Sequence, residues 1–439
     1  MPLVIQLSSH SFFKLFRRYL PILLLLFFTF SFLYSSDQSF NQDLGRHLKL
    51  GEIIWATHQI PHVNLFSYTF PGFSFVNHHW LFEVLVYLLS SALGIHALLV
   101  MKVIVLLLAV TLTLLVAKRV GSIFFFPVSF IFLHMLRGRI DLRPEIFSFL
   151  FTIITFTILE KYEKSDTKFI YILPLISMVW VNSHIYFPLG IFLQLIFVFH
   201  FLILRFVQKQ KGKETIKKLK TLTGITILSV LSSILNPNWF KGLLYPFTVF
   251  SNYGVTIAEN QTITTLQATG FVNPDFLFMG LCLMVIGLAF FVGLMMSRVT
   301  FKNIAILGLG IVLACQSIRG FPYLFFLSLP IVLVYLQFKK ETLWSNALSG
   351  FFVLLLFIES FYYLSGIYYQ VTYRNPSPVL VATEDAKPAL DFLLLHKLPQ
   401  PIFNNFDIGS YIIYRTFPDY QVYVDGRPEA YPASFLQQT

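Results

Sequence analysis

The sequence predicts an all-α polytopic membrane protein with about 11–12 transmembrane helices and a small extracytoplasmic α/β appendage at its C-terminus. Three observations carry this prediction. Of 439 residues, 56% are hydrophobic and only 12% are charged; mean hydropathy is +0.71; and apolar runs near the length of a membrane span recur along the chain. Because soluble domains carry about 25% charged residues, the composition excludes soluble and disordered classes.

The net charge of +11 indicates membrane orientation rather than a nucleic-acid partner. Lys and Arg gather in short clusters between apolar runs, as the positive-inside rule expects, whereas a nucleic-acid binder concentrates them on one soluble face. The two cysteines, Cys282 and Cys315, lie inside apolar runs and say nothing about redox compartment.

The first apolar run covers 19–36 and follows the basic residues of 14–18. This order predicts a membrane anchor with the N-terminus in the cytoplasm. A signal peptide is the alternative, since Ser35 and Ser36 are small residues near the end of the run. We favour the retained anchor in the plasma membrane.

The remaining apolar runs predict the other spans. They lie at 80–94, 96–117, 122–136, 144–160, 168–183, 185–206, 219–235, 275–297, 301–318, 321–338 and 346–366. Basic clusters separate them at Lys118–Arg119, Lys161–Lys168, Lys209–Lys220, Arg298–Lys302 and Lys339–Lys340. Placing every cluster inside leaves 37–79, 137–143, 236–274 and everything after 366 outside. The loops alternate between inside and outside only if 80–117 crosses the membrane once. Either 80–94 is therefore re-entrant or interfacial, or another short run is miscounted.

The chain changes character after 366. An amphipathic stretch, Asp385–His396, precedes short alternating runs at Tyr411–Arg415 and Gln421–Val424, separated by Gly and Pro. This pattern predicts an α/β domain over 367–439 that is distinct from the membrane domain of 1–366. It stops abruptly at Thr439 and could be incomplete.

Acidic residues are scarce, 21 in all, so their positions are informative. Asp37 and Asp43 open the large first outward loop, 37–79, near the expected outer membrane surface. A carboxylate there could act as general base on an acceptor hydroxyl, or hold a divalent cation against a lipid-linked phosphate. The structural alternative is a helix cap, because Asp43 directly precedes a helix-prone stretch, 44–54.

The same loop holds five of the eleven histidines. His47, His79 and Glu83 are candidate substrate-binding residues, with a hydrogen-bonded structural role as the alternative for Glu83. The five histidines lack a recognised ligand spacing and cysteine partners, which argues against a zinc site. Asn182 and His184, at an outer helix end, could line a cavity or satisfy the backbone of that end.

Four arginines are candidates for binding a lipid phosphate. Arg137, Arg139 and Arg143 share one short outward loop, and Arg319 is an isolated outward arginine. The planar guanidinium fork suits phosphate oxygens.

Each cation also has a structural alternative. The arginines could snorkel, or Arg139 could pair with Asp141 and Arg143 with Glu145. Lys102 lies within an apolar run. A charged side chain is costly inside a membrane, so Lys102 is a candidate functional residue. We expect it to snorkel instead.

Several motifs together resemble bacterial integral-membrane glycosyltransferase-like proteins of the GT-C superfamily, which includes protein mannosyltransferases and lipid A and core-sugar transferases. The motifs are Asp43-Leu44-x-x-His47-Leu48-x-x-Gly51-x-x-Ile54, Phe66-Ser67-Tyr68-Thr69, His78-x-Trp80-Leu81-Phe82-Glu83, Asp141-Leu142-Arg143-Pro144-Glu145, Trp180-Val181-Asn182-Ser183-His184, Leu235-Asn236-Pro237 and Val424-Asp425-Gly426-Arg427. They run over most of the chain, and each is short.

The resemblance implies a GT-C-like helical core, a polyprenyl-phosphate sugar donor, an inverted glycosidic product and a catalytic Asp in the first outward loop, matched by Asp43. Relatives often carry a second acid where this chain has Gln42, and another where it has Asn64. These departures weaken a metal-dependent version. The chain also lacks the Gly-rich loop of nucleotide-binding proteins, which fits a lipid-linked donor.

The sequence thus predicts a membrane glycosyltransferase with Asp43 as general base and an extracytoplasmic acceptor that could be lipid, glycan or protein. A flippase for a lipid-linked glycan is one alternative, although no inverted repeat is evident. A non-catalytic relative is the other. In the tail, Asp425 and Arg427 could bind a saccharide, but an internal contact across a tight turn is the interpretation we favour.

Overall fold

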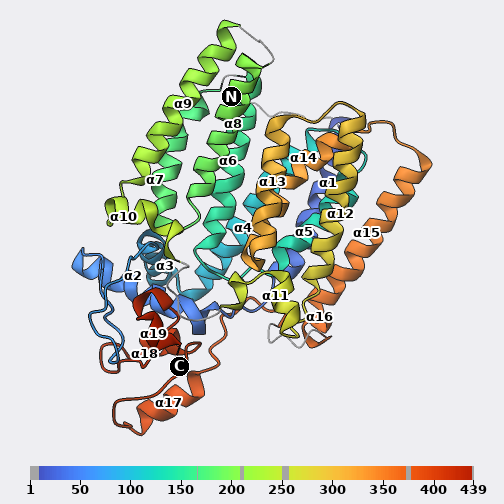
Figure 1. The fold of residues 1–439 in the computed structure, drawn as a ribbon. Helices are drawn as coiled ribbons and strands as arrows, with labels where there is room; N and C mark the ends of the chain where they lie inside the picture. Colours follow the sequence, from blue (N-terminus) through green and yellow to red (C-terminus); the bar gives the residue numbers. More distant parts are fainter. Residues whose placement is uncertain (1–8, 166, 208–211, 250–256, 372–376, 438–439) are drawn as a thin grey trace, which may run out of the picture.

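The computed structural model describes residues 9–165, 167–207, 212–249, 257–371 and 377–437, with backbone alone for 9–17. The regular secondary structure of these residues is helical, with no β-strand among them. Long helices pack side by side in a bundle, and shorter helices gather at one of its ends (Figure 1).

The bundle contains α1 (Ser9–Leu33), α4 (Ile95–Lys118), α5 (Phe125–Arg137), α6 (Glu145–Ser165), α7 (Leu173–Ser183), α8 (Pro188–Phe206), α9 (Lys213–Ser233), α12 (Asp275–Met295), α13 (Phe301–Gln316), α14 (Phe321–Tyr335) and α15 (Leu343–Leu364). The shorter helices are α2 (Gly45–Thr57), α3 (Trp80–Leu93), α10 (Trp239–Leu244), α11 (Ile263–Ala268), α16 (Ile367–Val371), α17 (Lys387–Leu395), α18 (Gly409–Thr416) and α19 (Ala433–Leu436). Single turns complete the structure at η1 (Phe40–Leu44), η2 (Lys168–Ile172), η3 (Tyr245–Phe247), η5 (Ala258–Asn260), η6 (Ile318–Gly320) and η7 (Pro428–Ala430).

Five of the described helices are long and apolar enough to cross a membrane: α4, α8, α12, η6 with α14, and α15. Helix α14 is enclosed by its neighbours, whereas α12 and α15 present rows of large apolar side chains on the surface of the bundle. So much contiguous apolar surface is typical of contact with lipid rather than water. The helical architecture of the long apolar segments is therefore confirmed, and these five helices are consistent with a bilayer environment. The count of 11–12 spans stays a prediction.

The segments predicted to face outward meet at one end of the bundle, which we call the loop end. It comprises 34–79, 138–144, 184–187 and 317–320 with the described parts of 234–274 and 365–437 (Figure 1). Contacts between these segments bind them together: Asn41 donates to Asp385 over 3.2 Å, and Arg143 donates to Glu259 over 2.8 Å.

The segment 80–117 runs along the bundle once. Helix α3 packs closely on α2, where a Cβ added at Gly51 would lie 2.1 Å from the carbonyl oxygen of Glu83. Lys102 in α4 binds Asp37 at the loop end, while Lys118, the last residue of α4, lines a groove with Leu20 of α1. Helix α3 thus lies beside α2 at the loop end, and within 80–117 the length of the bundle is covered by α4. The membrane topology stays a prediction.

The tail is helical where the sequence predicted an α/β fold. The amphipathic stretch forms α17 as expected, but Tyr411–Arg415, predicted as a strand, lies within α18. Gln421–Val424 is extended and forms a single bridge from Val422 to Ser67. A short apolar run does not distinguish strand from helix by its period, and packing of α18 on α2 decides the outcome.

Candidate functional site

Asp43 is held in place by a short π-helical turn, η1. Phe40 anchors the turn between the rings of Tyr411 and Tyr414, with centroid distances of 5.5 and 5.1 Å. Gly45 allows the close approach of α18, since an added Cβ would lie 2.5 Å from the carbonyl oxygen of Ser410. The expected cap was wrong: Leu44 precedes α2 and Asp43 makes no capping bond. Its carboxylate is therefore free of a helix-capping role.

The carboxylate of Asp43 lies in a cleft formed by two adjoining cavities at the loop end. The cavities measure about 630 and 100 Å³, and both are lined by Asp43, Arg143 and Arg319. The side chain of Asp43 is 19% exposed, accepts a hydrogen bond from Arg46 over 2.8 Å and faces the Nε atom of Arg143 at 3.4 Å. The two guanidinium groups hold this carboxylate in position at the cleft.

Three arginines from two segments, the α5–α6 loop and the turn η6, converge on Glu259. Arg139 and Arg143 each approach its carboxylate within 2.8 Å, and Arg319 within 2.9 Å. Burial alone would raise the pKa of Glu259, but the three guanidinium groups hold that pKa well below its usual range.

The ion pairs expected from the sequence were both wrong. Arg139 binds Glu145 over 2.8 Å instead of Asp141, and Arg143 binds Asp43 and Glu259 instead of Glu145.

Arg137 is separated from the other arginines of its loop. It is buried, donates through Nε to Asp275 over 2.9 Å and through NH1 to the Tyr363 hydroxyl over 2.7 Å. It is not among the residues that line the cleft. Its contacts instead tie the end of α5 to α12 and α15.

Asp37 is enclosed rather than presented to the cleft. It is 1% exposed and accepts bonds from Lys102 at 2.9 Å, the Leu142 amide at 2.7 Å and the Ser39 amide at 3.0 Å. The expected snorkelling of Lys102 was wrong, because its side chain is fully buried in this pair. With its oxygens so engaged, Asp37 is placed to hold the loop to the bundle.

The predicted histidines line the smaller cavity as neutral rings. His47 contacts Glu83 at 3.1 Å, and Glu83 accepts a second bond from Asn77 at 2.7 Å. His184 contacts Ser148 at 2.7 Å, and its ring lies 5.7 Å from that of His79. Burial, followed by nearby positive charges, holds the pKa values of the three rings well below their ordinary value. The positive charge of the cleft therefore comes from arginine.

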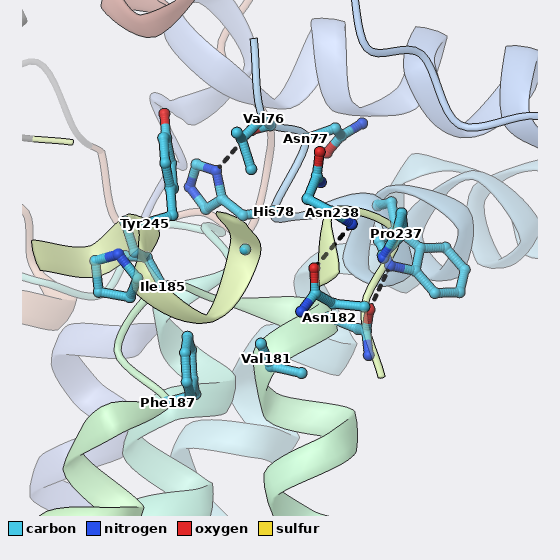
Figure 2. Close-up of a pocket in the computed structure, with 14 residues that line it drawn as sticks. Val76, Asn77, His78, Val181, Asn182, Ile185, Phe187, Pro237, Asn238 and Tyr245 are labelled. Carbon is cyan, nitrogen blue, oxygen red and sulfur yellow. Dashed lines mark hydrogen bonds between the residues drawn. The ribbon is translucent and has the colours of Figure 1, made fainter. Parts of the chain in front are cut away.

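Asn182 links neighbouring segments beside the cleft through hydrogen bonds. It accepts a bond from Trp80 over 2.7 Å and donates to the Leu235 carbonyl over 2.9 Å. Figure 2 shows it beside a small space that Asn238 and Tyr245 also line. That space, about 10 Å³, has room for no more than about one water molecule. Asn182 is thus placed to support the site from behind.

The tail closes one side of the cleft. Arg427 and Asp425 form a buried bidentate pair with two bonds of 2.7 Å, so the internal contact favoured from the sequence is confirmed. Arg427 also donates to Asn64 over 3.0 Å. Between them, Gly426 presses against the first loop, because an added Cβ would lie 2.7 Å from the carbonyl oxygen of Gln42.

The two departures from the GT-C pattern have structural partners. Gln42 accepts a bond from Arg143 over 2.8 Å, and Asn64 binds Arg427. Within the described residues, no three His, Cys, Asp or Glu side chains come together as metal ligands. Asp37, the second candidate for a cation, is already saturated by protein donors. The donor set does not fit a divalent cation at the expected position.

Sequence reasoning missed two residues of the cleft. Arg46 lies within the motif that begins at Asp43, but the sequence analysis assigned no role to Arg46 or to Glu259. The available signal for Glu259 was its isolation, since it is the one acidic residue of the outward segment 236–274.

Comparison with known proteins adds no family to this chain. No protein-family model matches it, and a search of curated proteins found no match.

Proposed function

We propose that the chain is a GT-C-like membrane glycosyltransferase that moves a sugar from a polyprenyl-phosphate donor to an extracytoplasmic acceptor. The observation that carries the proposal is the position of Asp43, a partly exposed carboxylate in a cleft beside a cluster of buried arginines. The pairing of a proton acceptor with phosphate-binding cations suits transfer from a phosphate leaving group.

In the proposed step, an acceptor hydroxyl attacks C1 of the donor sugar and its proton passes to Asp43. The C1–O bond to phosphate breaks, and its electron pair stays on the polyprenyl phosphate. Attack from the face opposite the phosphate inverts C1. Negative charge grows on the phosphate as the bond breaks, and Arg139, Arg143 and Arg319 stabilise it there.

Unsatisfied donors in the cleft support binding of an anion. The Nε atoms of Arg46 and Arg143 are buried and lack a hydrogen-bond partner within the described residues. A buried donor without a partner costs about 1–3 kcal/mol. Both guanidinium groups line the smaller cavity, so the cleft is suited to an oxygen-rich ligand.

The acceptor would enter through the larger cavity, between the first loop and the tail. Its tail side carries Phe403, Asn404 and Tyr423. Aromatic faces and amides together suit a polyhydroxylated acceptor. Asp37 and Arg137, which lie outside the cleft, would act only through the fold.

The proposal is tested by mass spectrometry of lipid-extracted cell-surface glycans from cells that carry wild type or Asp43→Ala at equal protein level. We expect one sugar to be missing in the variant, because the acceptor hydroxyl loses its base. Glu52→Gln is the matched control, since Glu52 lies on α2, pairs with Lys49 and does not line the cleft. Glycans identical in all three strains would refute Asp43 as the base and favour the flippase or the non-catalytic relative.

A further inference from the structure

Glu259 occupies the position that the proposed function assigns to the donor phosphate. Its two oxygens receive guanidinium groups from two segments: the α5–α6 loop, which supplies Arg139 and Arg143, and the turn η6, which supplies Arg319. Guanidinium forks bind carboxylate and phosphate with the same planar geometry. One carboxylate at their meeting point therefore marks a place of the size and charge of a single phosphate group.

The arginines are anchored independently of Glu259, with one exception. Arg139 also binds Glu145, and Arg143 also binds Asp43 and Gln42. For Arg319, Glu259 is the carboxylate partner within the described residues. If Glu259 withdrew, Arg139 and Arg143 would stay in place and the donors that it now occupies would become available.

Glu259 itself is held by little else. It sits in a single turn, η5, its side chain is 29% exposed, and its hydrogen bonds run to the three arginines. The arginines are more enclosed, at 5%, 12% and 22% exposed for Arg139, Arg143 and Arg319. The carboxylate is thus the exchangeable member of the cluster, and Arg139 and Arg143 are its independently anchored members.

The charge of the network selects the ligand. Four arginines (Arg46, Arg139, Arg143 and Arg319) meet three carboxylates (Asp43, Glu145 and Glu259), which leaves a net charge of +1. A phosphodiester carries one negative charge, so its exchange for Glu259 leaves this balance unchanged. A diphosphate brings at least one more negative charge, which the loss of one carboxylate does not offset.

We propose that Glu259 is an internal stand-in for the donor phosphate, displaced when a polyprenyl monophosphate-linked sugar binds and returning when the product leaves. The inference rests on the proposed function and names the donor class of that site. Glu259 keeps the arginines ordered and their charge compensated while no donor is bound. It also sets a threshold for binding, because every ligand has to compete with it.

The first test measures binding of polyprenyl phosphate to the purified full chain in detergent, read from the ligand-dependent rise of the unfolding temperature. In every test the polyprenyl phosphate is its methyl ester, so that the probe is a singly charged phosphodiester like the donor. We expect Glu259→Gln to bind about tenfold more tightly than wild type, because the charged competitor is gone. Glu341→Gln is the matched control, since Glu341 follows α14 whereas Arg319 precedes it, so the two lie at opposite ends of that helix. Polyprenyl diphosphate and inorganic phosphate serve as the comparison ligands and should bind more weakly to both proteins.

The second test needs no variant and decides the matter if Glu259→Gln fails to fold. Amide hydrogen exchange of wild type is compared with and without polyprenyl phosphate. Displacement predicts faster exchange in 257–268 on binding, while 137–145 becomes slower. Slower exchange in 257–268, or equal or weaker binding by Glu259→Gln, would overturn the inference.

The two proposals fail in different ways. The wild type could transfer sugar and bind polyprenyl phosphate while Glu259→Gln shows no gain in affinity and 257–268 shows no faster amide exchange. That result would refute the stand-in role of Glu259 and leave the proposed function in place. Wild type that neither binds polyprenyl phosphate nor depends on Asp43 removes the proposed function and this inference together.

Discussion

Asp141 is a carboxyl group at the loop end with no side-chain hydrogen bond within the described residues, although it lies close to the Asp37–Lys102 pair. Burial, and next the negative charge of Asp37, raise the pKa of Asp141 to about 6. An acid whose pKa is raised by folding favours the unfolded protein once it ionises. At neutral pH this residue therefore works against stability.

This shift makes a pH-dependent prediction. The penalty is absent below about pH 4, where Asp141 is protonated in both states, grows as pH rises towards 6 and is constant above that value. Asp141→Asn should raise the free energy of unfolding at pH 7.5 by up to about 3 kcal/mol, at about 1.4 kcal/mol per pKa unit. Thermal unfolding in detergent at pH 7.5 and pH 4 measures it, with the exposed Asp419→Asn as control. An equal gain at both pH values would contradict the assignment.

At the scale of elements, the buried pair of Asp37 and Lys102 fastens the loop after α1 to α4. Burial alone would raise the pKa of Asp37, but Lys102 and Ser39 lower it. Removing one member of such a pair leaves an uncompensated buried charge, which costs more than the pair itself contributes.

Lys102→Met should therefore destabilise the protein by about 3–5 kcal/mol. The double variant Asp37→Asn with Lys102→Met removes both charges and should recover most of that loss. Unfolding temperatures of the wild type, the two single variants and the double variant form the required cycle. A double variant as unstable as the sum of the singles would show that the pair is not coupled.

At the scale of the whole molecule, the tail forms part of the cleft wall, and its attachment depends on the Asp425–Arg427 pair. This pair contacts Asn64 of the first loop, and Arg427 lies over the rings of Phe66 and Phe75 at 5.0 Å. Burial alone would raise the pKa of Asp425, but Arg427 lowers it below its ordinary value. The stabilising contribution is thus full above the ordinary pKa of aspartate and is lost as pH falls through the lowered one.

Arg427→Met should release the tail from the first loop at neutral pH while leaving the bundle folded. Hydrogen exchange should increase within 377–437 and in 62–75, with little change in α14. In the wild type the same increase is expected only on acidification below about pH 4, since Asp425 stays ionised above it. Protection of 377–437 that is unchanged in the variant would show that other contacts hold the tail.

The sequence predicted the membrane class, the position of most apolar helices and the segments that meet at the loop end. Hydropathy and charge clusters act locally and are readable in one dimension. It also placed Asp43, Arg139, Arg143 and Arg319 among the site candidates, and the structure brings these four to one cleft. The roles assigned to them stay a prediction.

Local sequence patterns could not predict which charged side chains form ion pairs with one another. Arg143 and Glu259 are 116 residues apart in the chain, and Lys102 and Asp37 are 65 apart. The ion pairs considered from the sequence joined residues that are close along the chain. In the folded protein the ion pairs instead join residues from different segments. The α/β prediction for the tail was wrong for a related reason. Helix α18 is helical because it packs on α2, and its own short apolar run does not encode that contact.

Composition and periodicity by themselves determined that this chain forms a bundle of apolar helices with polar segments gathered at one end, because the cost of exposing apolar or polar surface acts on each residue separately. Only the tertiary structure decided which carboxylate lies in a cleft and which is buried in a lysine pair. It also decided which arginines share Glu259. Those outcomes depend on distances of a few ångströms between segments remote in sequence, where electrostatic interactions are strongest.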